Sequence, residues 1–154
     1  MDDPNYALIE GVCYFYDTTL RTKEEAVSYC TSNHGKLWEP KTMKKINEVH
    51  TKALSVSTNG HWWIGMTDTE SEGTFKFDSD GQNFPFLSKN SPWGDDQPGT
   101  SSAENCVFME RNNPLGFNDY PCDQKFFSIC ESTSIPPGNK KVYHDFLNLN
   151  QSKC

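Results

Sequence analysis

The sequence predicts one α+β domain, in which a strand and two helices precede several short strands. Helical periodicity is found in the N-terminal part of the chain, after a first apolar strand. Short apolar runs rich in aromatic residues follow it. Helices and strands that are segregated along the chain in this way are typical of α+β architecture.

The N-terminal elements can be placed from local signals. A strand is expected over residues 10–16, where β-branched and aromatic residues dominate. A helix then begins after Thr22, because Thr22 and Glu25 have the spacing of a capping box. Gly35 suits the C-terminal cap of that helix. A second helix is expected from residue 42 to about residue 54.

The remainder of the chain predicts short strands around one long loop. Residues 62–66 form an apolar run typical of a buried strand, and residues 75–77 alternate like a hairpin strand. Core strands are also expected over residues 106–109 and 126–130. Residues 79–100 contain three Pro and three Gly without apolar periodicity, and a loop of this length in a compact domain is usually functional.

The chain of 154 residues is long enough for one domain with a hydrophobic core. We expect this domain to occupy residues 1–132. A Pro-Pro-Gly sequence at 136–138 breaks the pattern. Residues 133–154 are therefore expected to form a C-terminal tail outside the core.

Charge and cysteine content restrict the class of protein. The net charge of −7, with no basic run, argues against nucleic acid or an anionic membrane as partner. No stretch is long and apolar enough to span a membrane. Six cysteines without a C-x-x-C pair predict a disulfide framework, and hence a secreted or extracellular protein. A cytosolic protein with six reduced thiols is the alternative.

Four residues around Cys106 offer hard oxygen atoms: Gln97, Glu104, Asn118 and Asp119. Two amides and two carboxylates are the ligands that calcium prefers, whereas zinc prefers His and Cys. The alternative interpretation is a polar surface loop in which such residues form turns.

An enzyme is not predicted. The chain contains no G-x-S-x-G, Walker or H-E-x-x-H motif. Glu104 and Asp119 could be considered as a glycosidase pair, but metal binding explains them better. The histidines are scattered over the predicted elements, at His34, His50, His61 and His144.

Three short motifs and four cysteines occur in a definite order. The motifs are W-I-G at 63–65, Q-P-G at 97–99 and F-N-D at 117–119, and the cysteines are Cys30, Cys106, Cys122 and Cys130. This pattern resembles the C-type lectin-like domain, which has W-I-G, then E-P-N or Q-P-D, then W-N-D. The resemblance covers about residues 8–131. It implies the family's fold, with two helices packed on short antiparallel sheets and a long calcium-binding loop.

The resemblance also implies two disulfides, Cys30–Cys130 and Cys106–Cys122, where the residues alone leave fifteen connectivities open. Cys13 and Cys154 remain. Either they form a third bridge within one chain, or one or both of them link two chains as a homodimer.

By the same resemblance, Gln97, Glu104, Asn118 and Asp119 are the ligands of the main calcium site, and the Gln97–Pro98 peptide bond is cis. Together with Gly99, these residues are expected to bind a sugar whose hydroxyls coordinate the ion. The implied function is a calcium-dependent lectin for glycans on cell surfaces or glycoproteins. Gln97 favours galactose-type sugars. Tyr120 and Phe84 are candidates for stacking on a sugar ring.

The sequence departs from the family at Gly99, where Asn or Asp would add an oxygen ligand. We therefore expect weak calcium binding, or help from Asp95 or Asp96. This departure favours an alternative function, a domain that binds a protein, lipid or other non-sugar ligand with weak or lost calcium dependence. Asp68 and Glu72 match two ligands of an auxiliary calcium site, and the alternative role for both is loop capping and solubility.

Overall fold

The computed structural model describes residues 3–86, 92–112 and 114–132. The predicted tail of residues 133–154 lies outside them, and so does Cys154. The domain boundary at residue 132 and the pairing of Cys13 with Cys154 therefore remain predictions.

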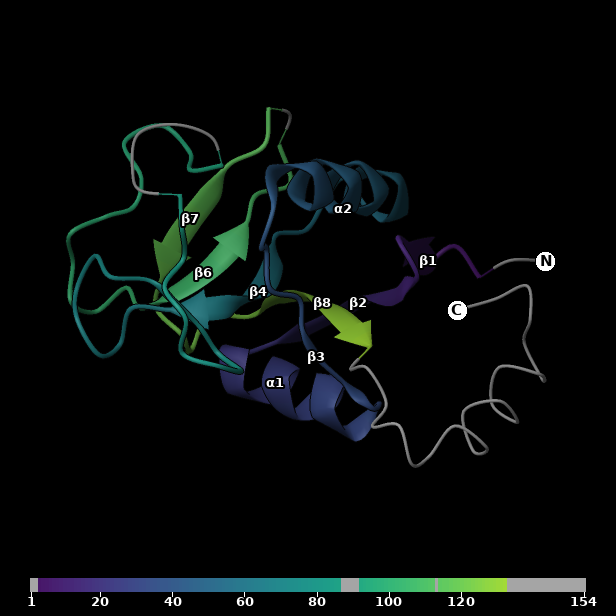
Figure 1. Cartoon of the computed structure of the whole chain (residues 1–154), viewed down its shortest axis with the longest axis horizontal. Helices are drawn as coiled ribbons and strands as arrows, with labels where there is room; N and C mark the ends of the chain where they lie inside the picture. Colours follow the sequence, from purple (N-terminus) through teal and green to yellow (C-terminus); the bar gives the residue numbers. More distant parts are fainter. Residues whose placement is uncertain (1–2, 87–91, 113, 133–154) are drawn as a thin grey trace.

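The described residues form the predicted α+β fold (Figure 1). One sheet of eight strands has the order β1-β2-β8-β4-β6-β7, with β3 paired to β8 and β5 paired to β4. The pairing of β4 with β8 is parallel, and the other strand pairs are antiparallel. The helices are α1 (Lys23–Ser32) and α2 (Met43–Val56), and the strands are β1 (Tyr6–Ile9), β2 (Val12–Arg21), β3 (Gly35–Leu37), β4 (Trp62–Thr67), β5 (Lys76–Phe77), β6 (Cys106–Met109), β7 (Phe117–Tyr120) and β8 (Phe126–Ser132).

Helix α1 begins as predicted and ends differently. Thr22 is the N-cap, and both hydrogen bonds of the capping box with Glu25 are present. The prediction of Gly35 as the C-terminal cap is wrong, because the C-cap is Asn33 and the residue with positive φ is His34. Gly35 instead starts β3, where a Cβ atom would lie 2.6 Å from the Glu131 carbonyl oxygen.

The two helices lie on opposite sides of the strands in Figure 1. Strand β4 contributes side chains to both core clusters. Trp62, Ile64 and Met66 pack in the cluster that contains the buried residues of α2. Trp63 packs in the second cluster with Ala26 and Cys30 of α1. This alternation explains why the apolar run at 62–66 has no polar face.

Both disulfides implied by the resemblance are present. Cys30–Cys130 joins α1 to β8 across 100 residues, and Cys106–Cys122 joins β6 to the segment after β7. On the chain-entropy model, the first bridge stabilises the fold by roughly 4–5 kcal/mol. The second bridge fixes β6 and β7 near the predicted site.

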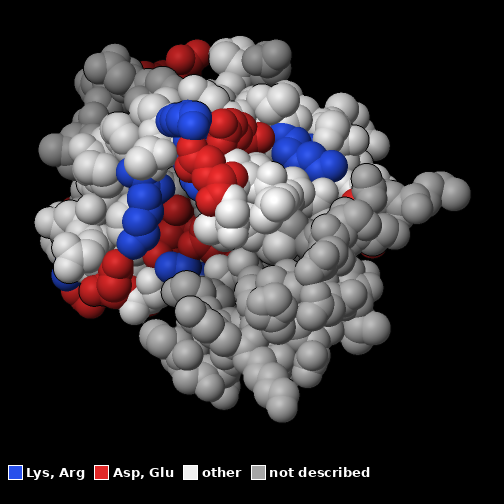
Figure 2. Space-filling model, turned by 45° about the vertical axis from the view of Figure 1, so that its right-hand side comes forward, with Lys and Arg blue, Asp and Glu red and all other residues white. Residues whose placement is uncertain are grey.

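Basic and acidic side chains lie interspersed on the face shown in Figure 2. Several charged residues of the described chain form ion pairs, including Lys36–Glu39 at 2.6 Å and Lys41–Asp80 at 2.8 Å. Neither helix of the described chain is long and apolar enough to cross a membrane.

Candidate functional site

Backbone hydrogen bonds join the end of the long loop to β7. The Phe117 N–H donates to the Pro92 carbonyl at 2.7 Å, and the Gly94 N–H donates to the Phe117 carbonyl at 2.9 Å. A turn closed by the Gln97 N–H and the Gly94 carbonyl at 3.1 Å follows, and the Gln97–Pro98 bond is cis, as predicted. A Cβ atom at Gly94 would lie 3.5 Å from both Gln97 Cγ and the Phe117 carbonyl oxygen, so the Gln97 side chain lies near the start of β7.

The next part of the loop meets Asp119. The Gly99 N–H donates to Asp119 Oδ1 at 2.6 Å. A Cβ atom at Gly99 would lie 3.1 Å from Glu104 Oε2 and 3.3 Å from Asp119 Oδ1. Position 99 therefore faces two of the predicted calcium ligands, and its side-chain position points between their carboxylates.

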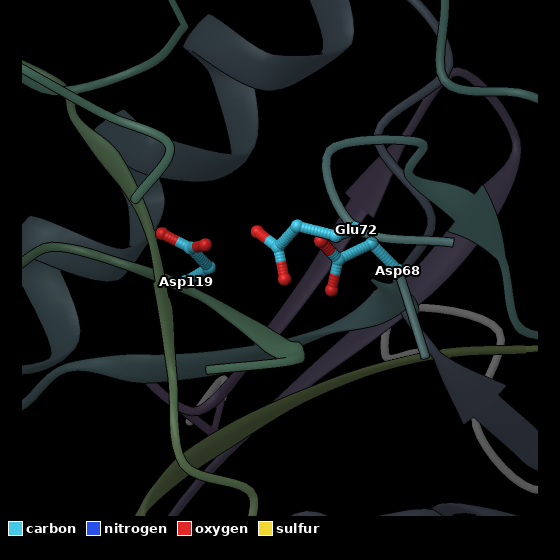
Figure 3. A group of neighbouring side chains, drawn as sticks. All are labelled: Asp68, Glu72 and Asp119. Carbon is cyan, nitrogen blue, oxygen red and sulfur yellow. The ribbon is translucent and has the colours of Figure 1, made fainter. Parts of the chain in front are cut away.

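The Asp119 carboxylate also lies close to those of the two residues of the predicted auxiliary site. Figure 3 shows the carboxylates of Asp68, Glu72 and Asp119 turned toward one another, and one oxygen atom of each lies within 4.8 Å of the others. Asp68 is held by its N–H, which donates to the Asn105 carbonyl at 3.2 Å, and by the Gly73 N–H, which donates to Asp68 Oδ2 at 2.8 Å. The structure thus brings the main and auxiliary residues together through Asp119.

Four of these side chains bury an oxygen atom that accepts no hydrogen bond. Seven buried side-chain polar atoms of the described residues lack a partner, and four of them belong to this group. An unpaired buried oxygen normally lowers stability by about 1–3 kcal/mol, so four of them on predicted metal ligands require an explanation. They are Asp68 Oδ1, Gln97 Oε1, Asn118 Oδ1 and Asp119 Oδ2.

These oxygens fit a calcium ion. They come from two carboxylates and two amides, which is a hard donor set without His or Cys. Glu104 adds a third carboxylate beside Asp119, and Glu72 adds a fourth beside Asp68. The fit includes all six residues that the sequence predicted as metal ligands.

The electrostatics of the cluster also favour a cation. Burial, and then the charge of Asp119, raise the pKa of Asp68. Loss of hydration, and then the charges of Asp68, Asp119 and Glu104, raise the pKa of Glu72. In both residues loss of hydration and the neighbouring negative charges disfavour the charged form, and a bound cation would offset that penalty.

The other residues that were considered for sugar or calcium binding differ in their exposure. Phe84 is 3% exposed and packs in the core, so the prediction that it stacks on a sugar is wrong. Tyr120 is 41% exposed, and its ring contacts Phe108 and Phe126. Asp95 and Asp96 are exposed in the loop.

One neighbour of the predicted ligands was not found from the sequence. The Asn118 side chain donates through Nδ2 to Glu110 Oε1. Glu110 follows β6, and the β6–β7 register places it diagonally from Asn118 on the same face. Residues 117–120 were not predicted as a strand, so this pairing was not expected.

Comparisons with known proteins bear on the family and the fold. Residues 19–132 match the family model described as Lectin C-type domain. An alpha-N-acetylgalactosamine-specific lectin of Patiria pectinifera is 29% identical over 139 residues, which cover 85% of this chain and 80% of that protein. C-type lectin domain family 4 member M of Gorilla gorilla gorilla is 24% identical over 85% of this chain, which spans 33% of that protein's length. A solved structure, "Ca2+-dependent type II antifreeze protein (Ca2+-free form)", has the same fold, with a TM-score of 0.70 and 21% identity over 84% of this chain and 98% of that chain.

The fold and the family define a non-enzymatic binding domain. The chain belongs to the C-type lectin family, as the sequence motifs predicted.

Proposed function

We propose that this protein is a calcium-dependent lectin. Gln97, Glu104, Asn118 and Asp119 would hold the main calcium ion. Asp68 and Glu72, with Asp119, would hold a second ion beside it. The observation that carries the proposal is that Asp68, Gln97, Asn118 and Asp119 each bury an oxygen without a hydrogen-bond donor, which bound calcium would satisfy.

Calcium bound there would supply a Lewis-acidic centre for two neighbouring hydroxyls of a sugar. The side chains of this chain would supply the rest of the recognition. The Glu104 carboxylate can accept hydrogen bonds from sugar hydroxyls, whereas Gln97 and Asn118 can direct an amide oxygen to the ion and an N–H to the sugar. Gly99 adds no ligand, so the calcium affinity is expected at the weak end for extracellular modules, about 10⁻⁴–10⁻³ M.

We propose a galactose-type sugar as the ligand. Gln97 at the first loop position favours it by family resemblance, and a 29% identical relative carries the name alpha-N-acetylgalactosamine-specific lectin. The disulfides Cys30–Cys130 and Cys106–Cys122 support a role outside the cell, where such bonds persist. Glycans on cell surfaces or glycoproteins would then be the partners, and a homodimer through Cys13 or Cys154 belongs to the same proposal.

Gly99 also favours a second candidate, a domain that binds a protein, lipid or other non-sugar ligand. A site with fewer ligands binds calcium more weakly, so a ligand held without direct metal coordination becomes the alternative.

A glycan array separates the two candidates. The proposal expects galactose-type glycans to be bound in millimolar calcium and released in EDTA. Asp119→Asn should abolish binding, whereas Asp80→Asn, which removes an exposed charge elsewhere, should retain it. Binding to no glycan in either buffer would reject the lectin function and favour the second candidate.

A further inference from the structure

The inference concerns the Asn118 side chain, whose two polar atoms have opposite environments. Its Oδ1 is buried and accepts no hydrogen bond from the described residues. Its Nδ2 donates to Glu110 Oε1. An amide can rotate by half a turn and exchange these atoms, so some feature of the protein must fix which atom faces the site.

Glu110 provides that feature because an ionised carboxylate accepts hydrogen bonds and cannot donate one. With Asn118 Oδ1 turned toward Glu110, two acceptors would face each other. The nitrogen atom of Asn118 must therefore face Glu110, and the oxygen atom must face the site.

Glu110 is itself held in place. Its N–H donates to the Gly116 carbonyl at 2.8 Å, which continues the β6–β7 pairing by one step. Its second carboxylate oxygen accepts a hydrogen bond from Asn112 Nδ2 at 3.2 Å. Two glycines leave room for the carboxylate, since a Cβ atom would lie 3.4 Å from Glu110 Oε2 at Gly116 and 3.7 Å from Oε1 at Gly94.

We propose that Glu110 is a positioning residue for calcium and sugar binding. It orients the Asn118 amide so that the oxygen is presented to the ion. It also places a negative charge behind a site that lacks a carboxylate at Gly99. This inference rests on the proposed function, and Glu110 itself is assigned no contact with the ion or the sugar.

Calorimetric titration of calcium into the protein tests the proposal. Partners that orient a metal ligand typically change metal affinity by 10–100-fold, so Glu110→Ala should weaken calcium binding by about tenfold or more. Glu110→Gln retains an oxygen that can accept the same bond, and its loss should be smaller. Glu10→Gln removes one charge from the turn after β1, at the opposite end of the sheet order from β7, and should bind as the parent does. Parental affinity in Glu110→Ala, or equal losses in the Ala and Gln variants, would overturn the orienting role.

A second experiment needs no calcium. In EDTA, Glu110→Gln should lower the melting temperature of the parent, because it weakens the charge-assisted hydrogen bond to Asn118. In an Asn118→Asp background the same change should raise it, because two carboxylates would otherwise face each other. An effect of the same sign and size in both backgrounds would show that Glu110 does not act on Asn118. If the parent binds no calcium, the proposed function fails, while this cycle still decides whether Glu110 orients the amide.

Discussion

Lys23 and Asp119 are both buried charged residues, exposed by 6% and 3%, yet their surroundings differ. The Lys23 ammonium donates to the Ile64 carbonyl at 2.7 Å and the Met66 carbonyl at 3.3 Å, and it pairs with Asp78 at 3.0 Å. Asp119 uses one oxygen to accept the Gly99 N–H and leaves the other without a donor.

The same contrast holds for two further buried carboxylates, Glu39 and Asp68. Glu39, exposed by 3%, accepts from Lys36 at 2.6 Å and from the Ser79 N–H at 2.8 Å. Asp68, exposed by 1%, keeps one oxygen unpaired and faces the charge of Asp119. The charged groups of Lys23 and Glu39 have hydrogen-bond and ion-pair partners within the chain, and these contacts stabilise the fold. Asp68 and Asp119 each keep an oxygen without a hydrogen-bond donor among the described residues, which is why we propose that they bind a cation.

Lys23→Met should give the largest loss of stability. It removes the ammonium and leaves two strand carbonyls and Asp78 without their donor, which should destabilise the fold by about 2–3 kcal/mol. Thermal unfolding should show the same loss in calcium and in EDTA. Lys44→Ala, which removes an exposed ammonium, is the control and should change little. A calcium-dependent loss in Lys23→Met would break the distinction between the two regions.

Asp119→Asn should remove the stabilisation that calcium gives. For a dissociation constant of about 10⁻⁴–10⁻³ M, calcium at about 10 mM should stabilise the parent by about 1–3 kcal/mol. The variant should show no calcium-dependent rise in melting temperature. In EDTA it should be at least as stable as the parent, since one of three clustered carboxylates is neutral. A full calcium shift in the variant would contradict the role of Asp119.

Asp68→Asn should have effects of opposite sign in the two buffers. Its folded-state pKa is raised by burial and by Asp119, so the charged form destabilises the calcium-free fold near neutral pH. The variant should therefore melt at a higher temperature than the parent in EDTA, and gain less from calcium. The advantage in EDTA should be complete above the raised pKa of Asp68 and disappear as the pH falls through it. A variant that is less stable than the parent in EDTA at neutral pH would contradict this.

Gly99→Asp should have the smallest effect, a tighter binding of calcium. The side-chain position lies between the carboxylates of Glu104 and Asp119, so an aspartate there adds a ligand and a charge. The added repulsion should lower the melting temperature in EDTA. Gly99→Ala controls for the backbone and should not tighten binding. Equal calcium affinities in the parent and both variants, measured by calorimetry, would show that position 99 does not face the ion.

The parts of the fold that the sequence predicted depend on local signals. Thr22 and Glu25 form their capping box because it needs only four consecutive residues. Strands β1, β3 and β7 were not predicted at their observed positions. Each has three or four residues, and β6, which is equally short, was predicted because it is a continuous apolar run. β7 also carries the polar pair Asn118 and Asp119, and it is a strand because β6 pairs with it.

The candidate ligands could be predicted because family motifs name them. Residues whose contacts depend on tertiary packing could not be predicted in this way. Gln97, Glu104, Asn118 and Asp119 were found from the motifs. Glu110 was not, because its contact with Asn118 follows from the β6–β7 register. The burial of Phe84 under the loop likewise depends on rings from other elements, such as Phe77, Trp93 and Phe117.

The most direct measurement is a calorimetric titration of calcium into the protein at neutral pH, with magnesium as the ionic control. If Asp68, Gln97, Asn118 and Asp119 bury their unpaired oxygens to hold a cation, calcium should bind saturably with a dissociation constant of about 10⁻⁴–10⁻³ M. Magnesium should bind more weakly, because it loses its water reluctantly. No saturable calcium binding up to about 10 mM, about ten times the upper limit of that range, would contradict the calcium site.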